Sequence, residues 1–187
     1  MQHKHHIVFL TGAGISQESG ISTFRDANGL WNNHKIEEVA SPEGFEKNPQ
    51  LVLDFYNARR RQLDEVAPNE AHHLIAQLET KYNVTVITQN IDDLHEKAGS
   101  TNVLHLHGEL RKSRSSKNPN LIYTCTQDIK LGDLASDGNQ LRPHIVWFGE
   151  EVTEIEKAIA ITQSADLFVI VGTSMVVHPA ASLLLAV

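Results

Sequence analysis

The sequence predicts an α/β fold, in which a parallel sheet is flanked by helices and a small module is inserted after the middle of the chain. Three short apolar runs, at 7–10, 84–88 and 167–171, each lead into a polar or glycine-containing turn, as buried parallel strands do. Helical patterns separate these runs, so that strands alternate with helices. In such sheets ligands bind outside the carboxyl ends of the strands, where the polar turns fall.

The elements are expected in a regular order along the chain. The first apolar run is expected to be a strand that enters a glycine turn and then a helix. Amphipathic patterns predict the later helices, and short apolar runs predict the later strands. The helices are expected at 49–63, 69–80 and 153–163, and the strands at 84–88, 103–105 and 167–171.

The segment 109–141 breaks this alternation, because it is rich in Ser, Lys, Asn, Asp and Gly and contains a single strand-like run at 121–125. We interpret it as a small inserted module. The flanking residues, 1–108 and 142–187, are expected to form the sheet domain together.

The composition bounds the function. With 187 residues, of which 41% are hydrophobic, the chain can bury one good core. The 23 acidic residues outnumber the 16 basic ones, which argues against a nucleic-acid partner. No apolar run reaches the roughly 20 residues of a membrane span, and the N-terminal run is too short for a signal peptide. With Cys125 as the only cysteine, we expect a cytoplasmic protein without disulfides, while the oligomeric state stays open.

The glycine turn after the first strand suggests a phosphate site. Gly12, Ala13 and Gly14 would let backbone N–H groups approach a diphosphate. However, Gln17 occupies the third glycine position of the dinucleotide-binding pattern. The motif alone therefore fits a dinucleotide site and a plain tight turn equally well.

Two further segments place polar side chains near strand ends. The first segment is a probable loop, and loop residues commonly contact ligands, although Arg25 and Asp26 could equally pair with each other. The second segment follows the apolar run 84–88. Its amide and carboxylate groups can bind ribose hydroxyls and a carboxamide, while a helix cap explains them equally well. The residues concerned are Phe24, Arg25 and Asp26 in the first segment, and Gln89, Asn90, Ile91 and Asp92 in the second.

His105 and His107 alternate on one face of a predicted strand. An unperturbed histidine titrates near about 6.5, so His107 is a candidate general base, although a strand histidine is more often simply hydrogen-bonded. A metal site formed by these two histidines lacks a nearby set of acidic or sulfur ligands, so no metal is expected.

The helix at 49–63 contains FYNARRRQ, three consecutive arginines in a chain of net charge -7. Residues three apart share a helix face, so Tyr56 and Arg59 are expected to point in the same direction. A phenol beside a guanidinium group can hold a carboxylate. A solvated helix face is the alternative.

Six motifs, in order over nearly the entire chain, closely resemble the sirtuins, which are NAD-dependent protein-lysine deacylases: TGAGIS, GISTFRD, TQNIDDLHEKAG, HLHGEL, LRPHIVWFGE and VGTS. The resemblance implies a Rossmann-like NAD-binding domain and an acyl-lysine peptide in the cleft beside the inserted module. It implies His107 as the catalytic base, with Asn90 and Asp92 at the nicotinamide ribose. The residues implied in NAD binding are Gly12, Ala13, Gly14, Phe24, Arg25, Asp26, Gln89, Asn90, Ile91, Asp92, Gly172, Thr173 and Ser174.

The resemblance also implies the substrate contacts. Tyr56 and Arg59 are similar to the pair that marks sirtuins able to remove succinyl or malonyl groups. A buried charged hydrogen bond of this kind contributes about 1.5 to 3 kcal/mol, or roughly 10- to 150-fold in discrimination. We therefore expect removal of succinyl, malonyl and acetyl groups from protein lysines, with nicotinamide and O-acyl-ADP-ribose as products. The segment similar to the substrate-pairing strand comprises Val146, Trp147, Phe148, Gly149 and Glu150.

The inserted module departs from the family pattern. Most sirtuins bind zinc there through four cysteines, but none of the corresponding positions is a thiol, so no zinc is expected. These positions are Ser115, Asn118, Leu134 and Asp137. The module is instead expected to pack around its own apolar residues, namely Leu121, Ile122, Tyr123 and Leu131.

A second departure lies at the end of the chain. Sirtuins usually continue with further strands, so the C-terminal part of the sheet domain is expected to be truncated. Two alternatives to a deacylase stay open on the sequence. One is a protein ADP-ribosyltransferase, and the other is a non-catalytic module that binds NAD or acyl-lysine.

Overall fold

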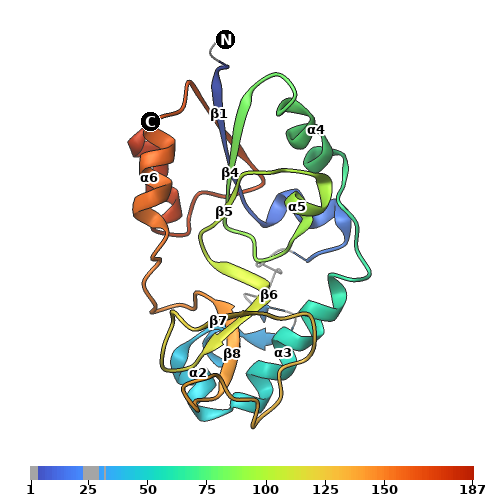
Figure 1. Cartoon of the computed structure of the whole chain (residues 1–187), viewed down its shortest axis with the longest axis vertical. Helices are drawn as coiled ribbons and strands as arrows, with labels where there is room; N and C mark the ends of the chain where they lie inside the picture. The colour runs from blue at the N-terminus through green and yellow to red at the C-terminus, as the bar shows by residue number, and fades with distance from the viewer. Residues whose placement is uncertain (1–3, 23–29, 32) are drawn as a thin grey trace.

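The computed structural model describes residues 4–22, 30–31 and 33–187, which form two lobes (Figure 1). The larger lobe contains a four-stranded parallel sheet with the strand order β5-β4-β1-β9. Its strands are β1 (His6–Thr11), β4 (Asn83–Thr88), β5 (Val103–His105) and β9 (Leu167–Val171). The predicted α/β fold class and the four predicted apolar strands are confirmed.

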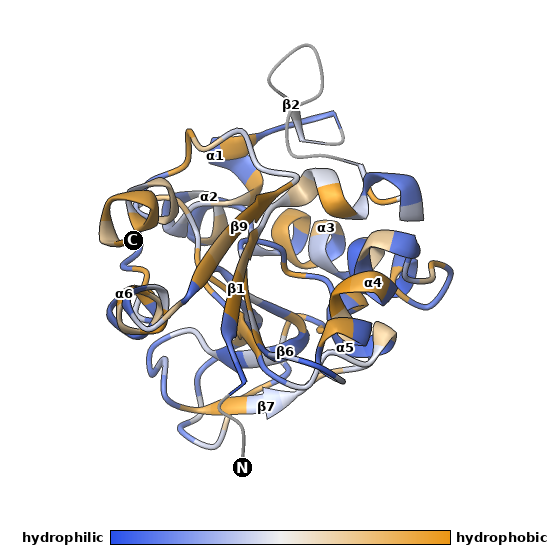
Figure 2. Ribbon diagram, turned by 90° about the horizontal axis from the view of Figure 1, so that it is seen from above, coloured by the Kyte–Doolittle hydropathy of each residue, from blue (hydrophilic) through white to orange (hydrophobic). Residues whose placement is uncertain are grey.

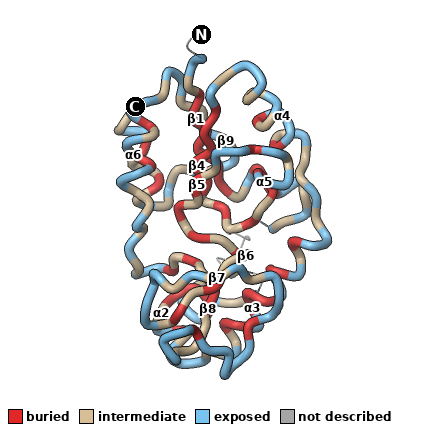
Figure 3. The backbone as a smooth tube through the Cα atoms, in the orientation of Figure 1, coloured by how far each residue is buried: buried red, intermediate tan, exposed pale blue. Residues whose placement is uncertain are grey.

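Helices cover both faces of this sheet (Figure 2). Successive side chains of a strand point to opposite faces. Val8 and Leu10 of β1 therefore pack towards α6 and η2, whereas Ile7 and Phe9 pack towards α4 and η1. The central strands are buried along most of their length (Figure 3). The helices of this lobe are η1 (Ala13–Ser19), α4 (Glu70–Leu78), α5 (Leu94–Ala98), α6 (Ile155–Gln163) and η2 (Ala180–Ala186).

The smaller lobe is built around an antiparallel sheet with the order β7-β6-β8. This sheet runs from Gly108 to Ile145 and is wider than the predicted module. The sequence did not indicate its outer limits, because β6 is polar along most of its length and β8 contains Pro143. The elements of this lobe are β2 (Leu30–Trp31), β3 (His34–Lys35), α1 (Ile36–Val39), α2 (Pro42–Lys47), α3 (Pro49–Gln62), β6 (Gly108–Ser115), β7 (Ile122–Thr124) and β8 (Leu141–Ile145).

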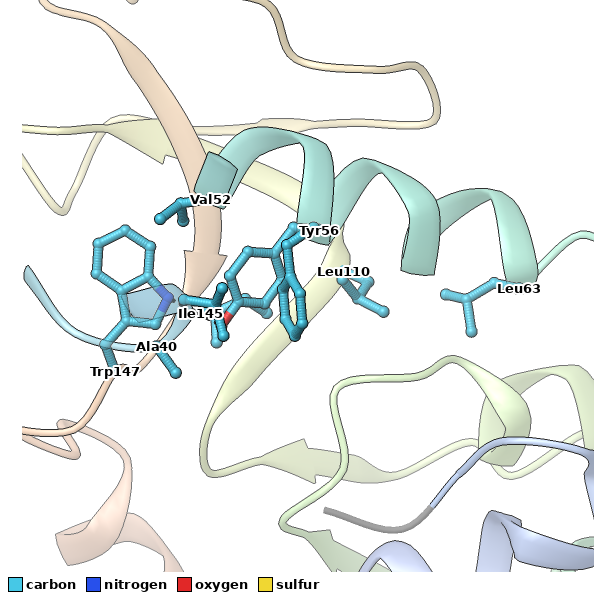
Figure 4. Packing of buried hydrophobic residues seen from close by; sticks show 9 residues of the cluster. Ala40, Val52, Tyr56, Leu63, Leu110, Ile145 and Trp147 are labelled. Carbon is cyan, nitrogen blue, oxygen red and sulfur yellow. Dashed lines mark hydrogen bonds between the residues drawn. The ribbon is translucent and has the colours of Figure 1, made fainter. Parts of the chain in front are cut away.

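The core of the smaller lobe lies between α3 and the strands β6 and β8. Val52 and Tyr56 of α3 pack against Leu110, Ile145 and Trp147 (Figure 4). The helix at 49–62 thus covers the inserted sheet. The position of α3 is consequently fixed by its packing on the module.

The expected packing of the module around Leu121, Ile122, Tyr123 and Leu131 is wrong. Ile122 is 44% exposed and Leu131 is 50% exposed. Ile122 lies on the edge strand β7, and Leu131 lies in a turn beyond it. The module contacts α3 instead through Leu110 of the central strand β6 and Ile145 of β8.

Hydrogen bonds occupy the positions where most sirtuins carry zinc ligands. The Ser115 hydroxyl donates to Asp137 over 2.7 Å and accepts the N–H of Asn118 over 3.1 Å. Leu134 forms a backbone bridge with Gln140. Within the described residues, no group of three or more His, Cys, Asp or Glu side chains is arranged to hold a metal ion. The absence of zinc stays a prediction.

Two of the three consecutive arginines fix the module to α3. Arg60 is 1% exposed, and it donates to the carbonyl of Leu110 and to the side chain of Asn57, over 2.8 Å in each case. Arg61 is exposed and pairs with Asp128 at 2.5 Å. The reading of FYNARRRQ as a solvated helix face therefore fits Arg61 but not Arg60.

Replacing Asn57 with alanine should destabilise the smaller lobe. The buried Asn57 amide group donates to the carbonyl of Ile129 and accepts its N–H, over 2.9 Å each. Without it, these groups and a guanidinium N–H of Arg60 lose their partners, and we expect a loss of about 2 to 4 kcal/mol in the free energy of unfolding. Urea denaturation measures this loss. The exposed Asp54→Ala variant of the same helix is the control, and equal effects of the two variants would contradict the structural role of Asn57.

The described part of the chain contains no helix that is both long and apolar enough to span a bilayer.

Candidate active site between the two lobes

A cavity of about 800 Å³ lies at the carboxyl ends of β1, β4 and β9 and reaches the smaller lobe. Ligand pockets commonly have volumes of roughly 300 to 1,000 Å³. Phe24, Arg25 and Asp26 lie outside the described residues. The predicted site residues that line the cavity are Gly12, Ala13, Gly14, Tyr56, Gln89, Asn90, Ile91, Asp92, His107, Val146, Trp147, Phe148, Gly149, Glu150, Gly172, Thr173 and Ser174.

Two glycine turns meet at one end of the cavity. The N–H of Gly14 donates to the carbonyl of Gly172 over 2.8 Å. Gly172 has a φ of +65°, and a Cβ atom there would lie 2.3 Å from the backbone nitrogen of Ile15. Glycine is therefore required at this position for the two turns to approach each other.

A buried network joins the end of β4 to the turn after β1. The Ser16 hydroxyl donates to the Asp92 carboxylate over 3.0 Å, and the Asn90 amide donates to Ser16 over 3.1 Å and to the Gly12 carbonyl over 3.2 Å. Burial raises the pKa of Asp92, although hydrogen bonds from Leu94 and Ser16 oppose this effect. Ser16 was not among the predicted site residues, because its only signal in the sequence is its place two residues after the glycine turn.

The side chain of Gln89 links two strand ends, since its amide donates to the Thr173 hydroxyl over 2.9 Å. Amide, hydroxyl and carboxylate groups from β1, β4 and β9 thus converge on one end of the cavity. These groups can donate to and accept from ribose hydroxyls and a carboxamide.

His107 is positioned as a neutral base. Its Nδ1 atom lies 3.0 Å from the carbonyl oxygen of Gln89. A carbonyl only accepts, so the proton of the neutral ring is on Nδ1 and the Nε2 lone pair is free. Burial lowers the pKa of His107, which keeps the ring neutral at pH 7. The side chain lines the cavity and can accept a proton there.

A second buried histidine pair lies behind the network. The ring centroids of His72 and His95 are 4.9 Å apart. His95 Nε2 lies 3.0 Å from the Thr11 hydroxyl, and His72 accepts the N–H of Asn69. Burial lowers the pKa of His72 to about 4 and that of His95 to about 3. Both rings are therefore neutral in the folded protein at pH 7.

Acid should destabilise the protein through this pair. In the unfolded chain both histidines titrate near about 6.5, so below that pH the unfolded state binds more protons than the folded state. The stability contributed by the neutral rings is present above about pH 6.5 and is lost as the pH falls towards the folded pKa values of about 4 and about 3. We expect a loss of about 2 kcal/mol for each histidine between about pH 7.5 and about pH 5.

Urea denaturation at a series of pH values measures this loss. His72→Gln should flatten the dependence of the unfolding free energy on pH. His73 is exposed on the same helix, and burial is the larger cause of the lowered pKa of His72, so His73→Gln should change the slope far less than His72→Gln. An unchanged slope in His72→Gln would exclude this histidine as a source of the acid sensitivity.

Tyr56 lies in the cavity wall on the side of the smaller lobe and is 0% exposed. The indole N–H of Trp147 donates to its hydroxyl oxygen over 3.0 Å. Burial raises the pKa of Tyr56, so the phenol keeps its proton and remains a donor. Trp147 is itself held by Arg142, whose guanidinium carbon lies 3.2 Å from the indole ring centroid and which pairs with Glu150 at 2.6 Å.

Arg59 lines a small cavity of about 50 Å³ that adjoins the larger one and shares Trp31, Ile91 and Asp92 with it. Its Nη1 atom donates to the carbonyl of Phe55 over 2.9 Å. Its Nη2 atom is buried without a hydrogen-bond partner among the described residues. Burial lowers the pKa of Arg59 to about 10, so the group is still charged at pH 7.

The segment 146–150 follows the strand β8, which ends at Ile145, and is not itself part of a strand. The N–H of Val146 donates to the carbonyl of His107, and that of Phe148 donates to the carbonyl of Ala40. The N–H of Trp147 donates to the Glu150 carboxylate over 2.9 Å. These donors are already paired within the chain, so backbone pairing with a substrate stays a prediction.

Comparisons with known proteins agree with this geometry. The model of the Sir2 family matches residues 12–179. An NAD-dependent protein deacylase of Helicobacter pylori is 62% identical over 178 residues, which cover 95% of this chain and 78% of that protein. A solved Sir2 homolog–NAD complex is 43% identical with a TM-score of 0.87, and the match covers 98% of this chain and 73% of that one. A Sir2 structure with an inhibitor, 2'-O-acetyl-ADP-ribose and a deacetylated peptide is 33% identical with a TM-score of 0.77, covering 96% and 75%.

Proposed function

Because the chain belongs to the Sir2 family and is an NAD-dependent protein deacylase, we propose that it removes succinyl and malonyl groups, as well as acetyl groups, from lysine side chains. The observation that carries the acidic-acyl preference is the buried guanidinium of Arg59, which lines the small cavity beside the large one and whose Nη2 group has no hydrogen-bond partner among the described residues. Burying an N–H donor of a charged group without an acceptor is costly, and an anion that accepts a hydrogen bond from it offsets this cost.

The residues at the glycine end of the cavity fit NAD. The hydroxyl, amide and carboxylate groups of Ser16, Asn90 and Asp92 are fixed by one another and suit ribose hydroxyls and a carboxamide. When bound there, NAD would supply an electrophilic ribose carbon that can accept the acyl oxygen, with nicotinamide as the leaving group. The protein orients the reactants, and His107 Nε2 accepts the proton of a ribose hydroxyl.

Tyr56 and Arg59 are proposed to bind the acyl group. Trp147 already donates to the phenol oxygen, so the O–H of Tyr56 is left to donate to an acyl carboxylate. Tyr56 lies in the wall of the large cavity and Arg59 in that of the adjoining small one, and Trp31 contacts both side chains. A carboxylate at this common wall would receive hydrogen bonds from two groups that can only donate to it.

The substrate is proposed to be an acylated lysine of a protein or peptide. The cavity is lined by residues of both lobes. One of them is Phe148, whose side chain is exposed. The single cysteine and the absence of a long apolar run in the sequence support a place in the cytoplasm. A sheet edge for the peptide backbone would require rearrangement of the segment 146–150.

Product analysis tests the reaction. Peptides carrying succinyl-lysine or acetyl-lysine are incubated with the protein, with and without NAD, and analysed by mass spectrometry. We expect NAD-dependent formation of free lysine, nicotinamide and O-acyl-ADP-ribose. A stable gain of ADP-ribose on peptide or protein, without loss of the acyl group, would instead indicate ADP-ribosyl transfer.

A further inference from the structure

A histidine outside the cavity joins the turn after β4 to α5. The Nδ1 atom of His105 lies 2.9 Å from the carbonyl oxygen of Asn90, and its Nε2 atom lies 2.8 Å from the carboxylate of Glu96. The side chain of His105 is 7% exposed, and that of Glu96 is 41% exposed. His105 thus contacts the residue that lies at the centre of the buried network.

The two contacts define the protonation state of His105. A carbonyl oxygen and an ionised carboxylate can only accept, so both ring nitrogens must carry a proton. A neutral imidazole has one N–H and satisfies only one of these partners. The next histidine on the chain, His107, donates only from Nδ1 to the carbonyl of Gln89. Two neighbouring carbonyls, at Gln89 and Asn90, are therefore held by one neutral and one charged histidine.

The surroundings of His105 agree with this assignment. Its charged and titratable neighbours are Glu96 and His95 of α5, Glu109 of β6 and Asp92 of the turn. Burial alone would lower the pKa of His105, but the hydrogen bond and charge of Glu96 outweigh it and raise the pKa above the ordinary value. Burial alone would raise the pKa of Glu96, but the hydrogen bond and charge of His105 lower it, so the contact favours the charged form of both side chains.

We infer that His105 and Glu96 form a charged positioning pair, which fixes the Asn90 carbonyl and thereby holds Asn90 and Asp92 at the NAD end of the cavity. His105 does not line the cavity and acts through Asn90. When His105 loses a proton, either the Asn90 carbonyl or Glu96 loses its donor. The support of the turn is therefore present while His105 is charged, and it is lost as the pH rises through the raised pKa.

The pair and the base act on opposite sides of the pH profile. His107 must be neutral, and its lowered pKa places the loss of activity on the acid side. His105 must be charged, so its deprotonation should lower kcat/KM for NAD as the pH rises. The alkaline limb of kcat/KM for NAD thus reports on a residue that touches neither substrate.

Glu96→Gln tests the inference, because it removes the charge and keeps the shape of the side chain. The alkaline limb of kcat/KM for NAD should move to lower pH by about one unit or more, and the loss relative to the wild type should grow with pH. Glu70→Gln is the control, because it removes the same charge from an exposed position on α4. It should leave the alkaline limb of kcat/KM for NAD in place.

An NMR titration of the His105 ring gives a readout without turnover. In the wild-type protein the ring should titrate above about 6.5, and in Glu96→Gln its pKa should fall. The inference is overturned if His105 titrates at or below about 6.5 in the wild type, or if the alkaline limb is the same in both proteins. The NMR result on the wild type decides the matter even where the variant folds poorly.

Discussion

Replacing His107 with alanine should lower the kcat for deacylation by about 10²- to 10⁴-fold, the usual contribution of a general base. The ring is the half-buried, neutral imidazole in the cavity whose Nδ1 donates to the Gln89 carbonyl. NAD binding should remain measurable, because the network of Ser16, Asn90 and Asp92 does not include His107. Formation of O-acyl-ADP-ribose measures turnover, and calorimetry measures NAD binding.

His73→Ala is the control for this experiment, because His73 is exposed on α4 and does not line the cavity. Its kcat should match that of the wild type. A His107→Ala protein that turns over at the wild-type rate would remove His107 from the mechanism.

Replacing Arg59 with methionine should separate the acyl groups. Methionine keeps an unbranched apolar side chain of similar reach but has no charge. The kcat/KM for desuccinylation should fall by roughly 10- to 150-fold, the range expected for one buried charged hydrogen bond. Deacetylation should fall far less, because an acetyl group carries no carboxylate that could accept a hydrogen bond from Arg59 Nη2, which has no partner among the described residues. Initial rates on matched succinyl-lysine and acetyl-lysine peptides measure the two effects.

Arg61→Met is the matched control, since it removes an arginine of the same helix that pairs with Asp128 at the surface. The ratio of the two activities should stay at the wild-type value in this variant. Equal losses of both activities in Arg59→Met would return Arg59 to a purely structural role, in which it only packs on Phe55 and Trp31.

The sheet of the larger lobe could be predicted because its strands form continuous apolar runs, and β1, β4 and β9 all lie at the predicted places. β1 and β4 are buried along most of their length, whereas β9 lies at the edge of the sheet and leaves Leu167 and Ile170 exposed. The sheet of the module could not be outlined in the same way. β6 alternates charged and buried small polar residues, and β8 contains a proline, so neither has an apolar pattern.

The sequence could predict site residues that lie close together in one motif, such as Asn90 and Asp92. It could not predict contacts between segments that are distant in the sequence. Trp147 reaches Tyr56, and His105 reaches Glu96, through contacts that only the fold creates. The helix spacing placed Tyr56 and Arg59 on one face, but it could not show that Trp31 contacts both side chains.

The central claim is that the protein uses NAD to remove acyl groups and selects those with a terminal carboxylate. The most direct test compares two peptides of one sequence, one carrying succinyl-lysine and the other its neutral carboxamide isostere, at equal NAD concentration. We expect kcat/KM to be higher for the succinyl peptide by roughly tenfold or more. Equal values for the two peptides would contradict the selection, and no NAD-dependent release from either would contradict the deacylase.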